Sequence, residues 1–400
     1  MKRLLLLLLI CSLFSPALLA QARRRGVGTT PEPATNFGDP LPRLTVANLT
    51  AFQNGAREFG DRKNINDGLG PVFNDVSCGA CHNQPAPGGG SARNVTRIGT
   101  VTNGSYDPLT NLGGSLLQDR AIGPQQGSTH PYRPEIVPAA ATIVARRRST
   151  PLYGLGLIDA TSDATFIALA ASEAARGDGT AGRVNMVDNP AAGTKTVGRF
   201  GWKAQVPSLF RFAGDASLNE IGITNPQFPN ENCPSGDCNE LQFNPRPGLN
   251  ATDVSIQSLA DFMEYLAAPP RGAITADVTA GEQVFQRIGC AACHVESLQT
   301  AANSNPALDR VTYQPYSDFL LHDMGALGDG VVQESSTARE MRTAPLWGLR
   351  MINRYLHDGR AATLEGAIGA HDGQAAVSRN QFNLLNATDR ARLLAFLRSL

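Results

Sequence analysis

The chain of 400 residues has no excess of charge of either sign, because Lys plus Arg and Asp plus Glu number 35 each. Without a basic field, the chain as a whole offers nothing that would attract nucleic acid. Beyond the N-terminal segment it has no apolar run long enough to cross a membrane, so we predict no membrane span. Strand patterns are also sparse and short, which favours a mainly helical fold with long loops.

Four of the seven cysteines form two copies of Cys-x-x-Cys-His. Two thiols at this spacing add across the vinyl groups of one porphyrin, and the adjacent histidine then meets the iron. A zinc site would need further cysteine or histidine pairs at ligand spacing, and a thiol redox pair would not require the histidine. We therefore predict two covalently attached haem c groups, with iron as the metal. Cys78 and Cys81 would attach the first haem and His82 would bind its iron, and Cys290, Cys293 and His294 would do the same at the second.

The N-terminus has the pattern of an export signal. A basic start, an apolar run from Leu4 to Phe14 and the small-x-small sequence Ala20-Gln21-Ala22 predict a signal peptide over residues 1–22, cleaved near Ala22. A Pro-rich segment, residues 23–43, follows it. Covalent haem is attached outside the bacterial inner membrane, so the expected location is the periplasm, where disulfides persist.

Three pairs of similar segments indicate that the chain repeats itself. In the first pair, Phe73 and Phe285 each precede a haem motif by five residues, and each is expected to pack on a porphyrin. The other two pairs are Arg148-Ser-Thr-Pro-Leu-Tyr-Gly with Arg342-Thr-Ala-Pro-Leu-Trp-Gly, and Asn250-Ala-Thr-Asp253 with Asn386-Ala-Thr-Asp389. In the last pair, Thr or Asp is expected to be the N-cap of a closing helix.

The repeats predict a mainly α fold of two cytochrome c-like domains in tandem, rich in loops, with an insertion in the first domain. The N-terminal haem domain would cover residues 44–270 and the C-terminal haem domain residues 271–400. The second domain would open with a capping box from Thr279 to Glu282. Cys233 and Cys238, within the insertion, are expected to form a disulfide across one loop.

The segment Leu356-His-Asp-Gly-Arg-Ala-Ala-Thr-Leu-Glu-Gly-Ala-Ile368 resembles the second domain of the bacterial di-haem cytochrome c peroxidase superfamily. With Gly198-Arg-Phe-Gly-Trp-Lys-Ala204 and Gly154-Leu-Gly-Leu-Ile-Asp-Ala160, the chain is most similar to the branch described as di-haem peroxidases or thiol oxidoreductases. The resemblance covers nearly all of the mature chain. The thiol name has weak support, because no other cysteine pair remains outside the haem motifs and the expected disulfide.

The resemblance implies a second ligand for the C-terminal haem. In these peroxidases it is the residue eight positions after the Thr of Thr-Leu-Glu, which is His371 in this chain. Thr363 would cap a short helix, and His371, at the end of that helix, would face a haem. Met324 is the main rival ligand, and a His/His iron would have a lower potential than a His/Met iron.

The resemblance also implies catalytic residues at the N-terminal haem. Peroxidases of the superfamily place a Glu over the reactive haem, about twenty residues after a Trp and followed by Met-Gly. Glu220 and Trp202 match these positions, although the spacing is slightly shorter and Ile221 replaces the methionine. Glu220 would move a proton between the peroxide oxygens, and Trp202 would pass electrons between the haems.

Three histidines remain. His130 could bind the first iron in a resting state, although an open site is the expectation there. His322 and His357 are expected to be structural, bonded to haem propionates or to the backbone. An open iron position decides the function, because peroxide and dioxygen can bind only there.

The leading hypothesis is a periplasmic di-haem oxidoreductase that reduces hydrogen peroxide at the N-terminal haem. A small redox protein would deliver electrons through the C-terminal haem. The alternatives are an oxygenase or protein-oxidising enzyme that uses dioxygen, and an electron-transfer cytochrome in which His130 and His371 close both irons. Calcium between the domains, as in the peroxidases, is possible but has no ligand motif in the sequence.

Overall fold

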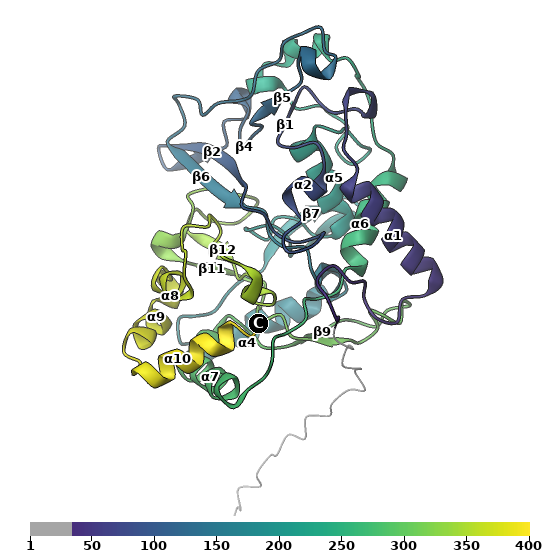
Figure 1. Cartoon of the computed structure of the whole chain (residues 1–400). Helices are drawn as coiled ribbons and strands as arrows, with labels where there is room; N and C mark the ends of the chain where they lie inside the picture. The colour runs from purple at the N-terminus through teal and green to yellow at the C-terminus, as the bar shows by residue number, and fades with distance from the viewer. Residues whose placement is uncertain (1–33) are drawn as a thin grey trace, which may run out of the picture.

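The computed structural model describes residues 34–400, so the predicted signal peptide and residues 23–33 of the Pro-rich segment lie outside it. Helices account for 36% and strands for 15% of the structure, so helix is the larger class, as predicted. Long loops join these elements (Figure 1). Within the described residues, none of the helices combines the length and the apolar character needed to cross a membrane.

The first haem motif is flanked by a packed helix pair, α1 (Val46–Gly60) and α6 (Asp253–Tyr265), which lie far apart in the sequence (Figure 1). The predicted N-cap of α6 is confirmed, because the Thr252 side chain accepts a hydrogen bond from the Ser255 N–H. The helices approach closely at Gly55, where a Cβ atom would lie 2.1 Å from the Ser258 carbonyl oxygen. Glycine is therefore required at this crossing.

The second haem motif has a corresponding helix pair, α7 (Ala276–Arg287) and α10 (Ala387–Leu397). A Cβ atom at Gly281 would lie 2.0 Å from the Arg392 carbonyl oxygen, so a glycine permits the crossing here as well. The predicted cap of α7 is wrong, because Thr275 caps the helix one turn earlier and Thr279 lies inside it. The predicted cap of α10 is wrong too, because Asn386 caps the helix and Thr388 and Asp389 lie inside its first turn.

Each helix pair holds a phenylalanine beside the motif histidine. The ring centroids of Phe59 and His82 are 6.2 Å apart, and those of Phe285 and His294 are also 6.2 Å apart. Phe285 thus lies beside the second motif histidine, where Phe59 takes the equivalent place in the first pair. Phe73 lies in a separate buried cluster, and Cys78 of the first motif packs against that cluster. That Phe73 and Phe285 pack on a porphyrin stays a prediction.

The region between the first motif and α6 contains a four-stranded antiparallel sheet that sequence patterns did not predict. Its central strand, β2 (Asn94–Thr102), pairs with β3 (Ser105–Asp107), β4 (Leu116–Leu117) and β6 (Ile143–Arg148). Most residues of β2 are half-buried, so the sequence shows no clear alternation of apolar and polar residues.

Most of the remaining elements are short, and α4 and α5 are the long helices among them. The helices are α2 (Cys78–Cys81), α3 (Leu155–Asp159), α4 (Asp163–Arg176), α5 (Leu209–Ile221), α8 (Leu364–Gly369) and α9 (Ala376–Asn383). The two-stranded pairs are β1 (Val72–Phe73) with β5 (Arg120–Ala121), β7 (Asn185–Asn189) with β8 (Thr194–Gly198), β9 (Leu298–Gln299) with β10 (Thr312–Tyr313), and β11 (Leu321–Asp323) with β12 (Glu340–Arg342).

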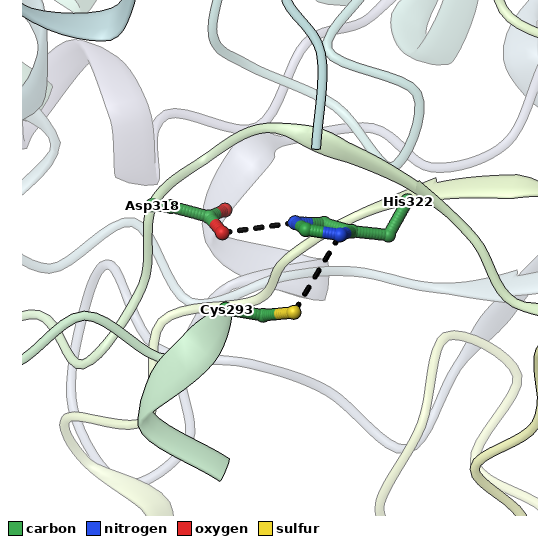
Figure 2. Close-up of side chains that lie close together, drawn as sticks. All are labelled: Cys293, Asp318 and His322. Atoms are coloured by element: carbon green, nitrogen blue, oxygen red, sulfur yellow. Dashed lines mark hydrogen bonds and ion pairs between the residues drawn. The ribbon is translucent and has the colours of Figure 1, made fainter. Parts of the chain in front are cut away.

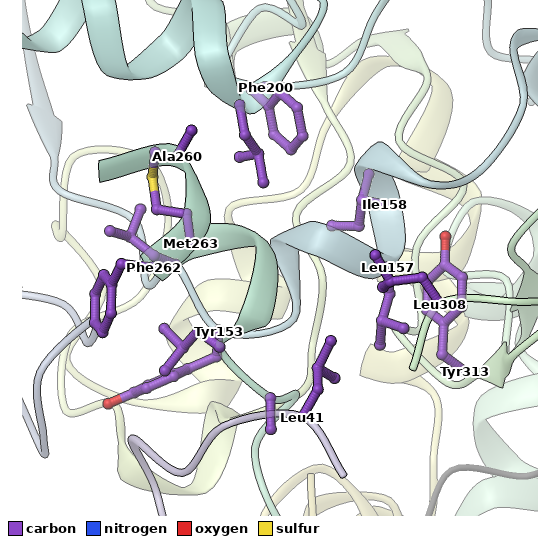
Figure 3. Close-up of a cluster of buried hydrophobic side chains, with 14 of the residues drawn as sticks. Leu41, Tyr153, Leu157, Ile158, Phe200, Ala260, Phe262, Met263, Leu308 and Tyr313 are labelled. Atoms are coloured by element: carbon purple, nitrogen blue, oxygen red, sulfur yellow. The ribbon is translucent and has the colours of Figure 1, made fainter. Parts of the chain in front are cut away.

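The largest hydrophobic core joins residues from both predicted domains. Around Phe262 and Met263 of α6 it gathers Leu157 of α3 and, from beyond the predicted boundary at residue 270, Leu308 and Tyr313 (Figure 3). A second core surrounds α7 and α10. The predicted boundary thus falls between the two helix pairs, but the large core crosses it.

The predicted disulfide between Cys233 and Cys238 is present. Glu135 anchors the disulfide loop, because its two carboxylate oxygens accept hydrogen bonds from the N–H groups of Gln118 and Ser235.

Replacing Gly55 with alanine is expected to lower the free energy of unfolding by about 1–3 kcal/mol, because the added methyl group overpacks the α1–α6 crossing. Urea unfolding measures the change. Gly60→Ala is the matched control, since it lies in the same helix and a Cβ atom there meets nothing within 4 Å. Equal stability of the two variants would contradict the close crossing.

Candidate functional site

A cavity of about 350 Å³ lies against the second haem motif. Cys290, Cys293 and His294 line it, and aliphatic side chains from α8 and α10 give it mostly apolar walls. Its volume and apolar lining are typical of small-molecule and cofactor sites.

Four histidines line this cavity, and two of them, His294 and His371, make similar hydrogen bonds. The Nδ1–H of His294 donates to the Tyr316 carbonyl oxygen at 2.8 Å, and the Nδ1–H of His371 donates to the Ala367 carbonyl oxygen at 2.8 Å. Because a carbonyl can only accept, Nδ1 carries the proton and Nε2 keeps the lone pair in each ring. Burial lowers the pKa of His294 to about 4 and also lowers the pKa of His371. Both imidazoles are therefore neutral at pH 7, as metal ligation requires.

The first motif has the same arrangement around its histidine. Helix α2 is capped by Ser77, whose side chain accepts a hydrogen bond from the Ala80 N–H. The Nδ1–H of His82 donates to the Gly89 carbonyl oxygen at 3.1 Å, and burial lowers the pKa of His82 to about 4. A smaller cavity, of about 70 Å³, reaches Cys78.

Glu220 lies near the first haem motif. It stands near the C-terminal end of α5, close enough to Cys81 to interact with it electrostatically. The Asn74 side-chain amide donates to the Glu220 carboxylate at 2.7 Å. Burial raises the pKa of Glu220 and outweighs this hydrogen bond and the nearby Arg97 guanidinium. The carboxyl is thus easier to protonate than one in water.

Trp202 lies elsewhere, in the wall of the large cavity. Its indole N–H donates to the Arg148 carbonyl oxygen at 3.0 Å, and its own carbonyl oxygen accepts from the Arg342 N–H at 2.9 Å. The Trp202 and His357 rings are 6.1 Å apart. The structure therefore does not bring Trp202 and Glu220 into one pocket.

A family model described as "Di-haem oxidoreductase, putative peroxidase" matches residues 139–400. This chain belongs to the di-haem oxidoreductase family. The family is one of peroxidase-like oxidoreductases, so the chain is an enzyme of this kind and haem is the cofactor that membership implies. The family resemblance read from the sequence is thus confirmed.

Three solved structures are similar along most of the chain. Hydrazine synthase from Kuenenia stuttgartiensis is 15% identical, with 94% of this chain and 99% of that chain covered and a TM-score of 0.40. A MauG-like protein associated with microbial copper homeostasis is 16% identical, with 93% and 95% covered and a TM-score of 0.38. The diheme peroxidase BthA from Burkholderia thailandensis is 13% identical, with 93% and 89% covered and a TM-score of 0.39. No curated protein matches the chain.

Two arginines in the large cavity show how this di-haem oxidoreductase fits its cofactor. The Arg148 side chain donates to the Ser91 carbonyl oxygen, and that of Arg342 donates to the carbonyl oxygens of Gly201 and Thr343. Among residues 34–400, neither arginine forms a salt bridge. Burial lowers the pKa of Arg342 to about 10, which still leaves it charged at pH 7. The carboxylate groups of haem propionates are anions that these two guanidinium groups could bind. Each arginine is the first residue of the repeated Arg-x-x-Pro-Leu-x-Gly segment, a sequence signal from which neither arginine was predicted as a cofactor contact.

His130 and His322 have other side-chain partners. His130 Nε2 lies 2.7 Å from a Glu240 carboxylate oxygen, and its ring stacks on Phe243, which disfavours it as an iron ligand. His322 is buried between Asp318 and Cys293 (Figure 2). In the described part of the chain these three residues are the only cluster with metal-ligand spacing, and one of them is a haem-motif thiol. We therefore assign neither calcium nor another ion to it.

A buried ion cluster supports the backbone beside Trp202. The Lys203 ammonium lies 3.2 Å from one Asp329 carboxylate oxygen, and the Arg147 guanidinium lies 2.7 Å from the other. Burial lowers the pKa of Lys203 to about 8, although Asp329 opposes the shift. The ammonium also donates to the Thr337 carbonyl oxygen at 3.0 Å, so the cluster ties Trp202 to the loop before β12.

Replacing Asp329 with alanine is expected to lower the free energy of unfolding by about 3–5 kcal/mol, because two buried cations lose their shared carboxylate. Chemical denaturation measures the loss. Asp188→Ala removes an ion pair with Lys195 that is exposed, and it is expected to cost less than about 1 kcal/mol. Similar losses in both variants would mean that the buried cluster contributes no more than the exposed pair.

Proposed function

We propose that the protein is a periplasmic di-haem c oxidoreductase that reduces hydrogen peroxide at the N-terminal haem, with electrons entering through the C-terminal haem. One observation carries the proposal. Two neutral histidines, His294 and His371, line the cavity of the second motif, whereas His130, the rival ligand for the first iron, is bonded to Glu240. This difference supports one closed and one open iron site.

The second site would serve electron entry. Cys290 and Cys293 would attach the haem, and His294 and His371 would bind its iron through Nε2. The carbonyl groups that accept from Nδ1 fix the orientation of both rings and increase their basicity. Met324 lines the same cavity, but no contact fixes its thioether as one fixes the His371 ring. The geometry therefore favours His371.

The first site would serve the chemistry. Cys78 and Cys81 would attach the haem and His82 would bind its iron from one side. Haem with an open iron position supplies a site for peroxide and the electrons for its cleavage. Hydrogen peroxide, two electrons and two protons give two water molecules. Glu220 would accept a proton from the nearer oxygen and return it to the leaving oxygen, and its raised pKa supports this role.

Electrons must reach the first site from outside. A small redox protein is the proposed donor, docking over a small interface as transient electron-transfer partners do. Trp202 lies in the wall of the large cavity, at the second motif, and is hydrogen-bonded to the backbones of Arg148 and Arg342. This position supports a place for Trp202 on the electron path between the two haems.

The electronic and EPR spectra of the holoprotein, with hydrogen peroxide added, test the function. We expect one high-spin ferric signal, lost on adding peroxide, and one low-spin signal. His371→Ala is expected to turn the low-spin haem high-spin, whereas His130→Ala leaves both signals unchanged. Two low-spin haems that stay inert to peroxide in every redox state would instead indicate an electron carrier, and turnover with dioxygen alone would indicate an oxygenase.

Glu220→Gln is expected to lower kcat for peroxide reduction by about 10²–10⁴-fold, because the amide cannot accept the proton. Stopped-flow peroxide consumption with a reduced donor measures it. Glu135→Gln is the control, since this buried carboxyl belongs to the disulfide loop. An unchanged rate in Glu220→Gln would remove Glu220 from the mechanism and leave the haem assignments standing.

A further inference from the structure

A buried carboxyl lies beside the second haem motif, and the peroxidase chemistry does not use it. Glu173, in α4, is fully buried. One of its carboxylate oxygens accepts a hydrogen bond from the Gly182 N–H at 2.9 Å. The other, Oε1, is buried and has no hydrogen-bond partner within residues 34–400. A buried unpartnered oxygen is costly when it is charged, so a proton on it would relieve the cost.

Glu173 faces three charged groups. They are Asp318, His322 and Arg176, whose guanidinium lies 4.0 Å from the carboxylate and whose side chain is about a third exposed. Asp318 and His322 form an ion pair with each other at 2.9 Å (Figure 2). Cys293 also interacts with Glu173 electrostatically.

This cluster contacts the haem motif at two points. His322 Nδ1 lies 3.5 Å from the Cys293 sulfur, the atom through which the haem would be attached (Figure 2). The Arg176 guanidinium donates to the Ala292 carbonyl oxygen, inside the motif, at 3.1 Å. Single side chains, His322 and Arg176, thus lie between Glu173 and the second haem motif.

The Asp318–His322 pair does not balance the charge of Glu173. Burial alone would lower the pKa of His322, but its hydrogen bonds to Asp318 and Cys293 raise it to about 11. Haem attachment removes the thiol, whereas the Asp318 contact remains, so the pair stays neutral overall. Burial and the nearby Asp318 raise the pKa of Glu173 to about 7. Glu173 is thus the member of the cluster that changes charge near neutral pH.

We propose that Glu173 takes up a proton when the C-terminal haem is reduced. The inference rests on the proposed function, since it needs a haem on Cys293. When the bound haem takes one electron from the donor protein, the Glu173 carboxylate would take one proton from solvent and become the carboxylic acid. Loss of one positive charge from the haem makes the nearby carboxylate less favourable, so protonation accompanies reduction.

The midpoint potential of this haem should therefore depend on pH. At a pH between the pKa values of Glu173 in the oxidised and the reduced protein, reduction takes up one proton. Each pH unit there changes the proton concentration tenfold, which shifts a one-electron midpoint potential by 59 mV. The potential falls as the pH rises through this window. Below it the carboxyl is protonated in both redox states, and above it the carboxyl is ionised in both, so the potential is level on either side.

Spectroelectrochemical titration of the holoprotein from about pH 5.5 to about pH 8.5 tests the inference. Glu173→Gln keeps an oxygen for the Gly182 N–H but cannot ionise, so the slope should disappear and the potential should stay at the acid limit of the wild type. Glu231→Gln is the matched control. Burial raises the pKa of Glu231 to about 7 as well, but this residue lies near the disulfide loop, so the slope should remain. A slope retained in Glu173→Gln overturns the inference.

A second variant keeps the test decisive if Glu173→Gln does not fold. Arg176→Gln removes the cation 4.0 Å from the carboxylate, which should raise the pKa of Glu173 and move the sloped window to higher pH. An unmoved window overturns the inference. The proposed function fails by a different result, which is a pyridine haemochrome assay that finds fewer than two haems in each chain.

Discussion

One hydrogen bond, from imidazole Nδ1 to a backbone carbonyl oxygen, recurs at His82, His294 and His371. Because the carbonyl can only accept, each bond fixes the tautomer and leaves Nε2 as the basic nitrogen. Burial keeps all three rings neutral, so each can act as a metal ligand without first losing a proton. The other three histidines lack this bond. The fold therefore separates candidate iron ligands from structural histidines by their second partner and not by their position in the sequence.

The cavity beside the second motif places a further constraint on what can occupy it. The half-buried Arg148 and the buried Arg342 line its wall with guanidinium groups bonded to carbonyl oxygens, and neither forms a salt bridge within residues 34–400. Asp318 favours the charged form of Arg342, but burial outweighs it and lowers the pKa of Arg342. An occupant that carries anionic groups on a large apolar surface would suit these cations, and haem has both. Cofactor binding would then contribute to folding stability, because it would supply an anionic partner to both arginines.

The sequence predicted best where local rules decide the outcome. The Cys233–Cys238 bridge and the cap at Thr252 follow from such rules, and both are present. The sequence failed where two positions satisfy the same rule. Thr275 and Thr279 are both suitable N-caps, and the helix that packs on α10 begins after the first. The spacing of Phe73 and Phe285 from the motifs also did not identify Phe59 of α1, whose ring lies beside the first motif histidine. The sheet around β2 was missed because its residues are half-buried on both faces.

The two helix pairs use the same contacts, so they cannot by themselves make the two sites different. Each has a glycine at the crossing and a phenylalanine beside the motif histidine. The difference comes from the region between the first motif and α6, which has no counterpart of equal length in the second half. Its helix α5 brings Glu220 to the first motif and its helix α4 brings Glu173 to the second. Glu173 is fully buried and Glu220 is half-buried, and burial raises the pKa of both. In the proposed function these two carboxyls would supply the proton chemistry of the two haem sites, one at each motif. Both would then come from the same region between the first motif and α6.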